Sequence, residues 1–158
     1  MKGVFILKAI TRTKLCKFRA RLLELFWQPL KRGETHPAEK FLARVIAGRD
    51  GLELMRWGVL TTWYSEDVRV MAVYILRLLP RLKECGDEAW RVALVAQALK
   101  SEDPSLRGAA LFSAAQWGGS ALLDVLMSHA ETDWVLEDYQ YKIIGAMARD
   151  SMERALRE

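Results

Sequence analysis

The sequence is poor in residues that cross-link a fold or bind metals. Only two cysteines, Cys16 and Cys85, and two histidines, His36 and His129, occur in 158 residues. The cysteines stand far apart, outside any CxxC, and no histidine lies at ligand spacing from them, so neither a disulfide framework nor a zinc site is indicated. Neither histidine has a serine or cysteine in a recognisable nucleophile setting, which argues against a catalytic triad. This cysteine usage fits a reducing, cytoplasmic environment.

Long apolar runs and linkers are also lacking. The four prolines and ten glycines are scattered, and no stretch has the composition of a linker. The apolar runs fall short of the ~18 residues that a membrane span needs. The first 23 residues carry cations and no acid, as mitochondrial transit peptides do, but Leu22 and Leu23 also suit a packed helix. With 51% hydrophobic and 28% charged residues, we expect a single domain over residues 1–158.

Positive charge is concentrated near the beginning of the sequence. Residues 1–50 contain 12 Lys or Arg and 4 acids (12 − 4 = +8), whereas residues 51–158 contain 12 Lys or Arg and 16 acids (12 − 16 = −4). Such a polarised charge can attract an acidic protein, a phosphate backbone or an anionic membrane, or can keep one end of the molecule hydrated.

Apolar residues recur at helical spacing along most of the chain, and strict alternation is rare. Helix starts are recognisable at Ser65, which precedes two acids, and at Asp103, which precedes Pro104; the capping side chain accepts first-turn amide hydrogens, and proline has none to donate. These patterns predict an all-α protein. The two clearest stripes, with spacing i, i+3, i+4, are Val68, Met71, Ala72, Ile75, Leu79 and Leu106, Ala109, Ala110, Ala114, Trp117.

Two segments of the chain are similar to each other. They are WGVLTTWYSEDVRVMAVYILRLL (57–79) and RVALVAQALKSEDPSLRGAALFSAAQW (91–117). Each contains a helix, then Ser-Glu-Asp, then a short turn and Val-Arg or Leu-Arg, with an alanine three residues after the arginine. Internal similarity of this kind is typical of helical repeats. The segments resemble the HEAT repeat, whose second helix typically begins D-x-x-V-R-x-x-A after a tight turn.

This resemblance implies an α-α superhelix of about four antiparallel helix pairs. The last pair departs from the pattern, because Glu137 stands at the arginine position and Tyr139 and Gln140 stand at the alanine positions. Atypical end repeats are expected, since one side of them faces water. The expected pairs are a basic first pair 11–48 (helices 11–28 and 37–48), HEAT-like pairs 50–80 (50–63 and 66–80) and 87–117 (87–100 and 104–117), and a diverged capping pair 119–148 (119–130 and 134–148).

The HEAT resemblance also implies which residues serve the scaffold. In this family the turn aspartate and arginine commonly bond between adjacent repeats, and the second helices usually line the concave, ligand-facing side. Two enzyme families built on such repeats do not match: the chain has no His-Glu dipeptide of the di-iron hydroxylases and no tryptophan-and-aspartate segment of the DNA alkylation repair glycosylases. The residues assigned to the scaffold are Asp67, Arg69, Asp103 and Arg107.

Basic residues border the apolar stripe of the first predicted helix. Lys14, Lys17 and Arg21 lie on one flank of the stripe, and Arg12 and Arg19 lie on the other. These cations either form a solvated rim or bind an acidic protein, a nucleic-acid backbone or a membrane surface. If the second helix folds back beside the first, the patch also includes Arg44, with Lys31, Arg32, Lys40 and Arg49.

Six tryptophans are many for this length. Trp57, Trp63, Trp90 and Trp117 lie on or beside apolar stripes, which favours packing between repeats over a stacking surface. Trp134 is the better candidate for exposure. If the last pair is an open end, this residue could bind a partner together with the aromatic side chains of Tyr139 and Tyr141.

The run His129-Ala-Glu131-Thr-Asp133 contains three residue types that can bind metals. Its spacing in a turn between helices specifies no geometry, so we interpret it as a solvated turn in which Asp133 caps the next helix. Scattered acids such as Glu88, Asp124 and Glu137 have no spacing that supports a hydrolase site. No cofactor, metal or small-molecule substrate is indicated.

Two hypotheses follow from the sequence. The first is a non-enzymatic HEAT-like adaptor, or a small inhibitor or immunity-type protein, that binds a protein partner, acidic if it meets the basic patch. The second is a nucleic-acid-binding module that uses the basic first pair.

Overall fold

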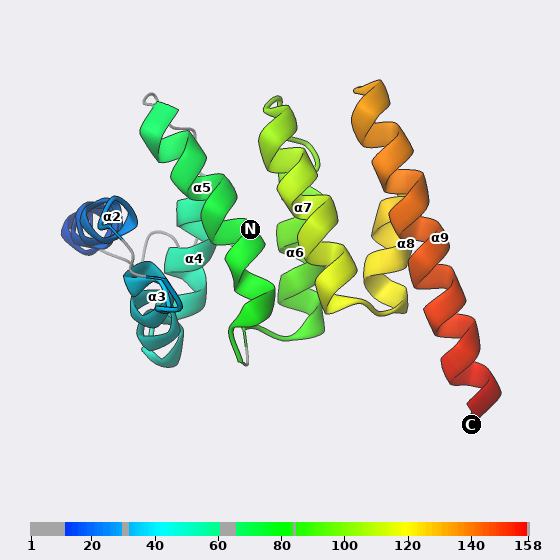
Figure 1. Cartoon of the computed structure of the whole chain (residues 1–158), viewed down its shortest axis with the longest axis horizontal. Coiled ribbons are helices and arrows are strands. Elements are labelled where there is room, and N and C mark those ends of the chain that lie inside the picture. Colours follow the sequence, from blue (N-terminus) through cyan, green and yellow to red (C-terminus); the bar gives the residue numbers. More distant parts are fainter. Residues whose placement is uncertain (1–11, 30–31, 61–65, 84, 158) are drawn as a thin grey trace. The chain divides into compact units, whose positions relative to one another are not determined.

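The computed structural model describes residues 12–29, 32–60, 66–83 and 85–157, without the side chains of residues 66–68. Helices occupy most of these ranges and no strand occurs in them (Figure 1). The predicted all-α class is confirmed. The helices form two compact units, Met1–Cys85 and Gly86–Glu158. The boundary between the units falls between the second and third predicted pairs.

The first unit contains four α-helices and a short 3-10 turn in its described residues. They are α2 (Arg12–Phe26), α3 (Pro37–Ala47), α4 (Gly51–Leu60), α5 (Glu66–Leu78) and η1 (Leu79–Arg81). His36 begins α3, because its Nδ1 accepts a hydrogen bond from the Ala38 amide at 3.0 Å, and Pro37 occupies a position that needs no donor. These boundaries match the predicted pairs 11–48 and 50–80 to within a few residues.

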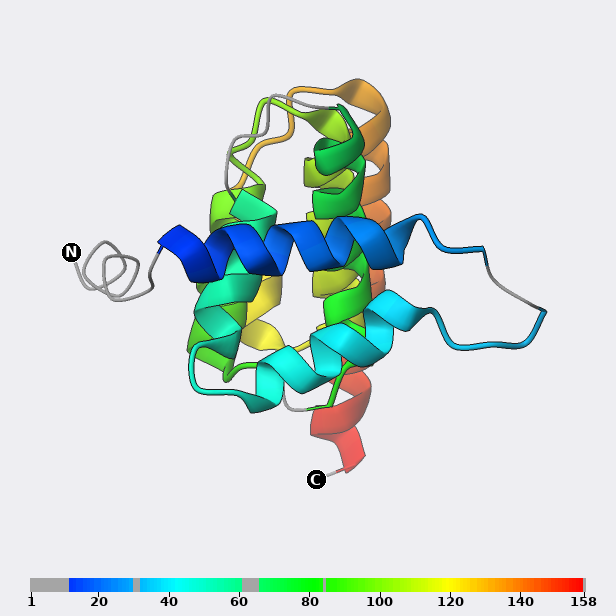
Figure 2. The ribbon, with the colours of Figure 1, turned by 90° about the vertical axis from the view of Figure 1, so that its left-hand side faces the viewer.

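Helix α2 crosses α4 and α5 and contacts both of them (Figure 2). Its apolar stripe supplies the buried Phe18, Leu22 and Leu25. Phe18 stacks on Phe41 of α3 at 5.9 Å and meets Trp57 of α4 edge-on at 6.5 Å between ring centroids. The first pair therefore packs through aromatic rings.

A second aromatic cluster links α2, α3 and α5. The ring of Phe26 lies 5.0 Å from that of Tyr74 and 6.0 Å from that of His36. Burial raises the pKa of Tyr74 above its usual 10.0, the nearby Glu39 carboxylate raises it further, and Arg81 lowers it. The folded state thus favours the neutral phenol of Tyr74, so the free energy of unfolding falls as the pH rises above 10.

The second unit consists of α6 (Glu88–Ala98), α7 (Pro104–Trp117), α8 (Ser120–Ser128) and α9 (Trp134–Arg157). Aspartates begin two of these helices: Asp87 accepts from the Trp90 amide at 2.8 Å, and Asp103 accepts from the Ser105 amide at 3.0 Å. Gly118 ends α7 with a φ of +69°, a conformation that L side chains rarely adopt.

The helices of the second unit stack in two rows. Helix α6 packs on α8, and α7 packs on α9, while α6 pairs with α7 and α8 with α9 (Figure 1). The first helix of one pair therefore contacts the first helix of the next pair, and the second helix contacts the second, as in stacked helical repeats. Small residues on α7 allow close approach: Ala109, Ala110 and Ala114 are buried, and a Cβ on Gly108 would lie 3.3 Å from Leu136 of α9.

Helices α6 and α7 lie within the range 87–117 that the sequence indicates for the third pair, whereas α9 is longer than the indicated range 134–148. Helix α9 continues to Arg157, nine residues beyond the predicted end at residue 148. Its last turns are exposed and contain an ion pair between Arg154 and Asp150, 3.0 Å apart and one turn from each other. Such i,i+4 pairs stabilise a helix without any tertiary contact.

Candidate partner-binding site

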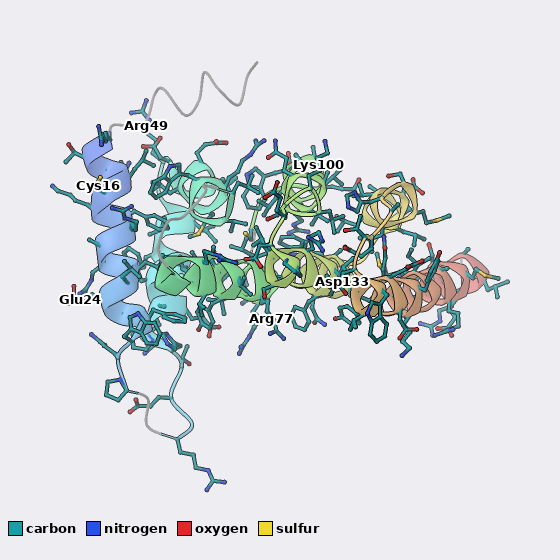
Figure 3. All side chains as sticks on the ribbon, turned by 90° about the horizontal axis from the view of Figure 1, so that it is seen from above. Cys16, Glu24, Arg49, Arg77, Lys100 and Asp133 are labelled. Atoms are coloured by element: carbon teal, nitrogen blue, oxygen red, sulfur yellow. The ribbon has the colours of Figure 1, made fainter. Side chains whose placement is uncertain are left out.

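The first turns of α9 place aromatic residues at the surface of the second unit. Asp133 caps the helix: its Oδ1 accepts from the amides of Val135 at 2.9 Å and Leu136 at 3.2 Å, as predicted for this aspartate. Figure 3 shows Asp133 at the start of α9. The cap fixes the direction in which the following side chains leave the helix.

Trp134 and Tyr141 are the most exposed aromatic residues of α9, with 80% and 66% of their surface accessible. They are seven residues apart, so two helical turns bring them to the same face. Tyr139 is also exposed, at 37%, but one hundred degrees per residue puts it on a different side of the helix from Tyr141. We call these three residues the aromatic end of α9. It is the one group of predicted site residues in the second unit.

Gln140 fixes the first turns of α9 against α8 from a buried side of the helix. It is buried, and its Nε2 donates to the carbonyl of Leu126 at 2.8 Å and to that of His129 at 2.7 Å. These carbonyls belong to the end of α8, where the last turn has no partners within the helix. The departure from alanine at position 140 therefore has a structural cause, because the amide caps α8 and joins it to α9.

Replacing Gln140 by leucine is expected to destabilise the protein by about 1–3 kcal/mol, because the buried carbonyl of Leu126 and the partly buried carbonyl of His129 lose their donor. The thermal unfolding midpoint, followed by far-ultraviolet circular dichroism, should drop by several degrees. Gln116→Leu is the matched control, because Gln116 is exposed on α7. Equal midpoints for the two variants would contradict the capping role.

Arg107 makes a buried connection between the turns before α7 and α9. Its Nε donates to Oε1 of Glu131 at 2.7 Å, and its Nη1 donates to the carbonyls of Ser101 at 2.9 Å and Glu102 at 3.1 Å. Glu131 Oε1 also accepts from the amides of Thr132 and Asp133. The interpretation of the 129–133 turn as solvated is wrong for Glu131, whose side chain is only 1% exposed.

At its second occurrence, residues 101–103, the Ser-Glu-Asp motif thus makes hydrogen bonds that order the turn before α7. Ser101 Oγ accepts from the Asp103 amide at 3.1 Å, Asp103 caps α7, and Arg107 binds the first two carbonyls of the motif. At the first occurrence, Ser65 and the side chain of Asp67 lie outside the described residues, and Arg69 is exposed.

The basic flank of α2 belongs to the first unit, and acids engage two of its cations. Lys14 pairs with Asp50 in the turn between α3 and α4, and Arg21 pairs with Glu24 one turn along α2 at 2.9 Å. Lys17 is exposed between them. Figure 3 shows Arg49 near the start of α2, on the same turn as Asp50. The flank is therefore less positive than the sequence suggests.

The remaining predicted cations are exposed on two helices. Arg19 lies on the other flank of α2, and Arg44 lies on the exposed face of α3. The basic residues thus belong to the first unit and the aromatic end of α9 to the second. Lys31 of the predicted patch lies outside the described residues.

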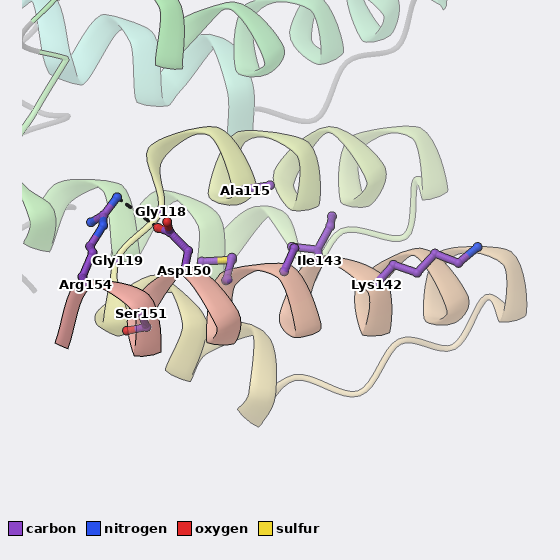
Figure 4. A pocket seen from close by; sticks show the side chains of 10 residues that line it. Ala115, Gly118, Gly119, Lys142, Ile143, Asp150, Ser151 and Arg154 are labelled. Carbon is purple, nitrogen blue, oxygen red and sulfur yellow. Dashed lines mark ion pairs between the residues drawn. The ribbon is translucent and has the colours of Figure 1, made fainter. Parts of the chain in front are cut away.

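A pocket of about 310 Å³ opens between the end of α7 and the middle of α9 (Figure 4). Gly118 and Gly119 line one side of it, and Ile143 and Met147 line the other. Asp150 lies at the edge in the ion pair with Arg154. The pocket is mainly apolar, and it lies on a different face of α9 from Trp134 and Tyr141.

No described helix is long and apolar enough to cross a membrane. In the described ranges no three His, Cys, Asp or Glu residues converge on a point where a metal ion could bind. No protein-family model matches the chain, and neither a curated protein nor a solved structure matches it.

Proposed function

We propose that the protein is a non-enzymatic, HEAT-like adaptor or small inhibitor that binds a protein partner through the aromatic end of α9. The exposure of Trp134 and Tyr141 on one helix face carries the proposal. Tryptophan and tyrosine are the residues that most often dominate protein interfaces, because they bury a large area with little loss of side-chain entropy. We place this activity in the cytoplasm, since the sequence has only two cysteines, whose spacing indicates no disulfide framework.

The scaffold supports such a role. Asp133, Gln140 and the Arg107–Glu131 pair fix the start of α9 by hydrogen bonds to backbone and side chains. A rigid element that presents aromatic residues loses little entropy when a partner binds. An adaptor and an inhibitor would use the same exposed aromatic residues to bind a partner.

Nucleic-acid binding by the basic flank of α2 has weaker support. One flank of α2 carries Lys14, Lys17 and Arg21. Lys14 already pairs with Asp50, and Arg21 already pairs with Glu24. A phosphate backbone would have to displace these acids. Binding of random DNA or RNA at about 50 mM salt that is lost in Lys17→Ala, with Trp134→Ala unaffected, would favour this alternative.

A photo-crosslinking experiment tests the proposal. Benzoylphenylalanine in place of Val135, which is exposed beside Trp134, is expected to capture a protein partner in a lysate of the source cells. Once the partner is identified and purified, Trp134→Ala or Tyr141→Ala should weaken its binding at least about tenfold, because such anchors contribute 1.4 kcal/mol or more.

Trp27→Ala provides the matched control, because Trp27 is a tryptophan of the first unit that is also exposed. It should leave both the adduct and the affinity unchanged. Absence of any adduct at Val135, or equal weakening by Trp27→Ala and Trp134→Ala, would contradict the assignment of the binding surface.

A further inference from the structure

Exposed apolar residues continue along α9 beyond its aromatic end. Met152 is 67% exposed and Leu156 is 85% exposed. Both stand at positions that continue the helical spacing of the exposed Trp134 and Tyr141. Steps of seven, four, seven and four residues connect them through Gly145, so all lie along one side of the helix. We call Trp134, Tyr141, Gly145, Met152 and Leu156 the outer stripe.

The outer stripe points away from α7. Two residues turn a helix by about 200°, and the residues that follow its first three members by two positions are Leu136, Ile143 and Met147. Leu136 lies beside Gly108 of α7, and Ile143 and Met147 are buried. The stripe is thus the side of α9 opposite its α7 contact, where a stacked helix would pack next.

An end surface of a helix stack normally carries polar residues. This one carries four large apolar side chains over a helix of 24 residues, about 36 Å long at 1.5 Å per residue. Exposed apolar surface of this kind marks an interaction site. A helix of similar length is the shape that fits it.

Two pairs of residues on the exposed side of α9 stand at equal distances on either side of Gly145. Trp134 and Leu156 lie eleven residues on either side of Gly145, and Tyr141 and Arg149 lie four residues on either side. Two antiparallel copies crossing at Gly145 would place tryptophan on leucine and tyrosine on arginine. Glycine at the crossing point allows close approach because it has no side chain, and the space beside it is open, since a Cβ there would meet only Arg149 Nη1, at 3.8 Å.

Charge also favours the antiparallel arrangement. Residues 134–141 contain two acids and no cation, whereas residues 142–157 contain four cations and two acids. An antiparallel pair puts the acidic beginning of each helix beside the basic end of the other, and it opposes the two helix dipoles. A parallel pair would place Asp138 beside Asp138.

From these observations we infer that the outer stripe binds a second copy of the chain, as an antiparallel α9–α9 pair with a two-fold axis at Gly145. The inference rests on the proposed function and names the partner as the same protein. In this dimer Trp134 of each copy packs on Leu156 of the other, so the contact is made twice.

Sedimentation equilibrium with charge-complementary variants tests the dimer. The wild-type protein is expected to form a dimer that dissociates on dilution. Trp134→Lys and Leu156→Asp should each raise the dissociation constant at least about tenfold, because both homodimers bury an unpaired charge. An equimolar mixture of the two variants should dimerise again, since the new lysine meets the new aspartate at one contact and unchanged Trp134 meets Leu156 at the other.

The controls separate assembly from folding. Both substituted residues are exposed, so circular dichroism spectra should equal that of the wild type. Met127→Asp places a charge on an exposed apolar residue of α8 instead, and it should leave the dimer intact. Failure of the mixture to dimerise would overturn the antiparallel arrangement, because only that arrangement joins positions 134 and 156.

The outcome also separates this inference from the proposed function. A wild-type chain that stays monomeric at about 100 µM would overturn the dimer. If a different protein is then crosslinked at Val135, the proposed function and its binding surface still stand. A dimer that neither Trp134→Lys nor Leu156→Asp weakens would overturn the inference alone, since its interface would lie elsewhere, and crosslinking at Val135 would still decide the proposed function.

Discussion

Replacing Arg107 by methionine is expected to lower the free energy of unfolding by about 3–5 kcal/mol. The substitution leaves the Glu131 carboxylate, 1% exposed, without its guanidinium partner. It also removes the donor for the carbonyls of Ser101 and Glu102. Urea unfolding followed by circular dichroism measures the change.

Arg154→Met is the matched control for Arg107→Met. Arg154 also pairs with an acid, Asp150, but both side chains are exposed, and such pairs contribute about 1 kcal/mol or less. The double variant Arg107→Met/Glu131→Leu should regain part of the loss, because it removes the isolated charge, but not all, since the amides of Thr132 and Asp133 lose their acceptor. Equal destabilisation by the two single variants would contradict the buried pair.

The second large effect is expected at Gly51, the first residue of α4. A Cβ at this position would lie 2.1 Å from the carbonyl oxygen of Val45 and 2.7 Å from Cα of Ile46. Both atoms belong to the backbone of α3, so they cannot move without shifting a helix. We expect Gly51→Ala to cost about 3 kcal/mol, the upper end for overpacked sites, measured by chemical unfolding.

Gly58→Ala, in the same helix, serves as the comparison. Its Cβ would meet side-chain atoms, Phe18 Cε1 at 3.3 Å and Ile75 Cδ1 at 3.5 Å, which can adjust. Alanine also gains up to about 1 kcal/mol of helix propensity. Its net effect should therefore be small, and a loss equal to that of Gly51→Ala would show that the distance to the α3 backbone is not the cause.

The helices of this protein could be predicted from sequence because their signals are local. The stripe through Phe18, Leu22 and Leu25 repeats at helical spacing, and the caps at Asp103 and Asp133 stand directly before their helices. Both kinds of pattern occupy a few adjacent residues. They indicated the helices, and they identified the caps that begin α7 and α9.

The polar links between helices could not be predicted in this way. Arg107 and Glu131 are 24 residues apart, and no pattern in the sequence connects them; only the packing of α7 on α9 brings their turns together. The length of α9 was missed for another reason, because Met152 and Leu156 face solvent and do not extend the buried stripe. The i,i+4 spacing of Asp150 and Arg154 was the signal that could have indicated it.

The candidate site was predicted in part. Trp134, Tyr139 and Tyr141 are exposed, whereas the basic flank of α2 is partly neutralised by Asp50, which lies 36 residues from Lys14. Such neutralisation depends on how the α3–α4 turn packs, and counting charges along the sequence does not reveal it.

The short sequence separation of the polar links in the second unit has a consequence for folding speed. Gln140 bonds to carbonyls 14 and 11 residues away, and the Arg107–Glu131 pair spans only two helices. Loops of this size close at low entropic cost, and proteins rich in such local contacts fold in microseconds to milliseconds. We therefore expect residues 86–158 to fold quickly, with α8 and α9 joining as soon as the turn at residues 129–133 has formed.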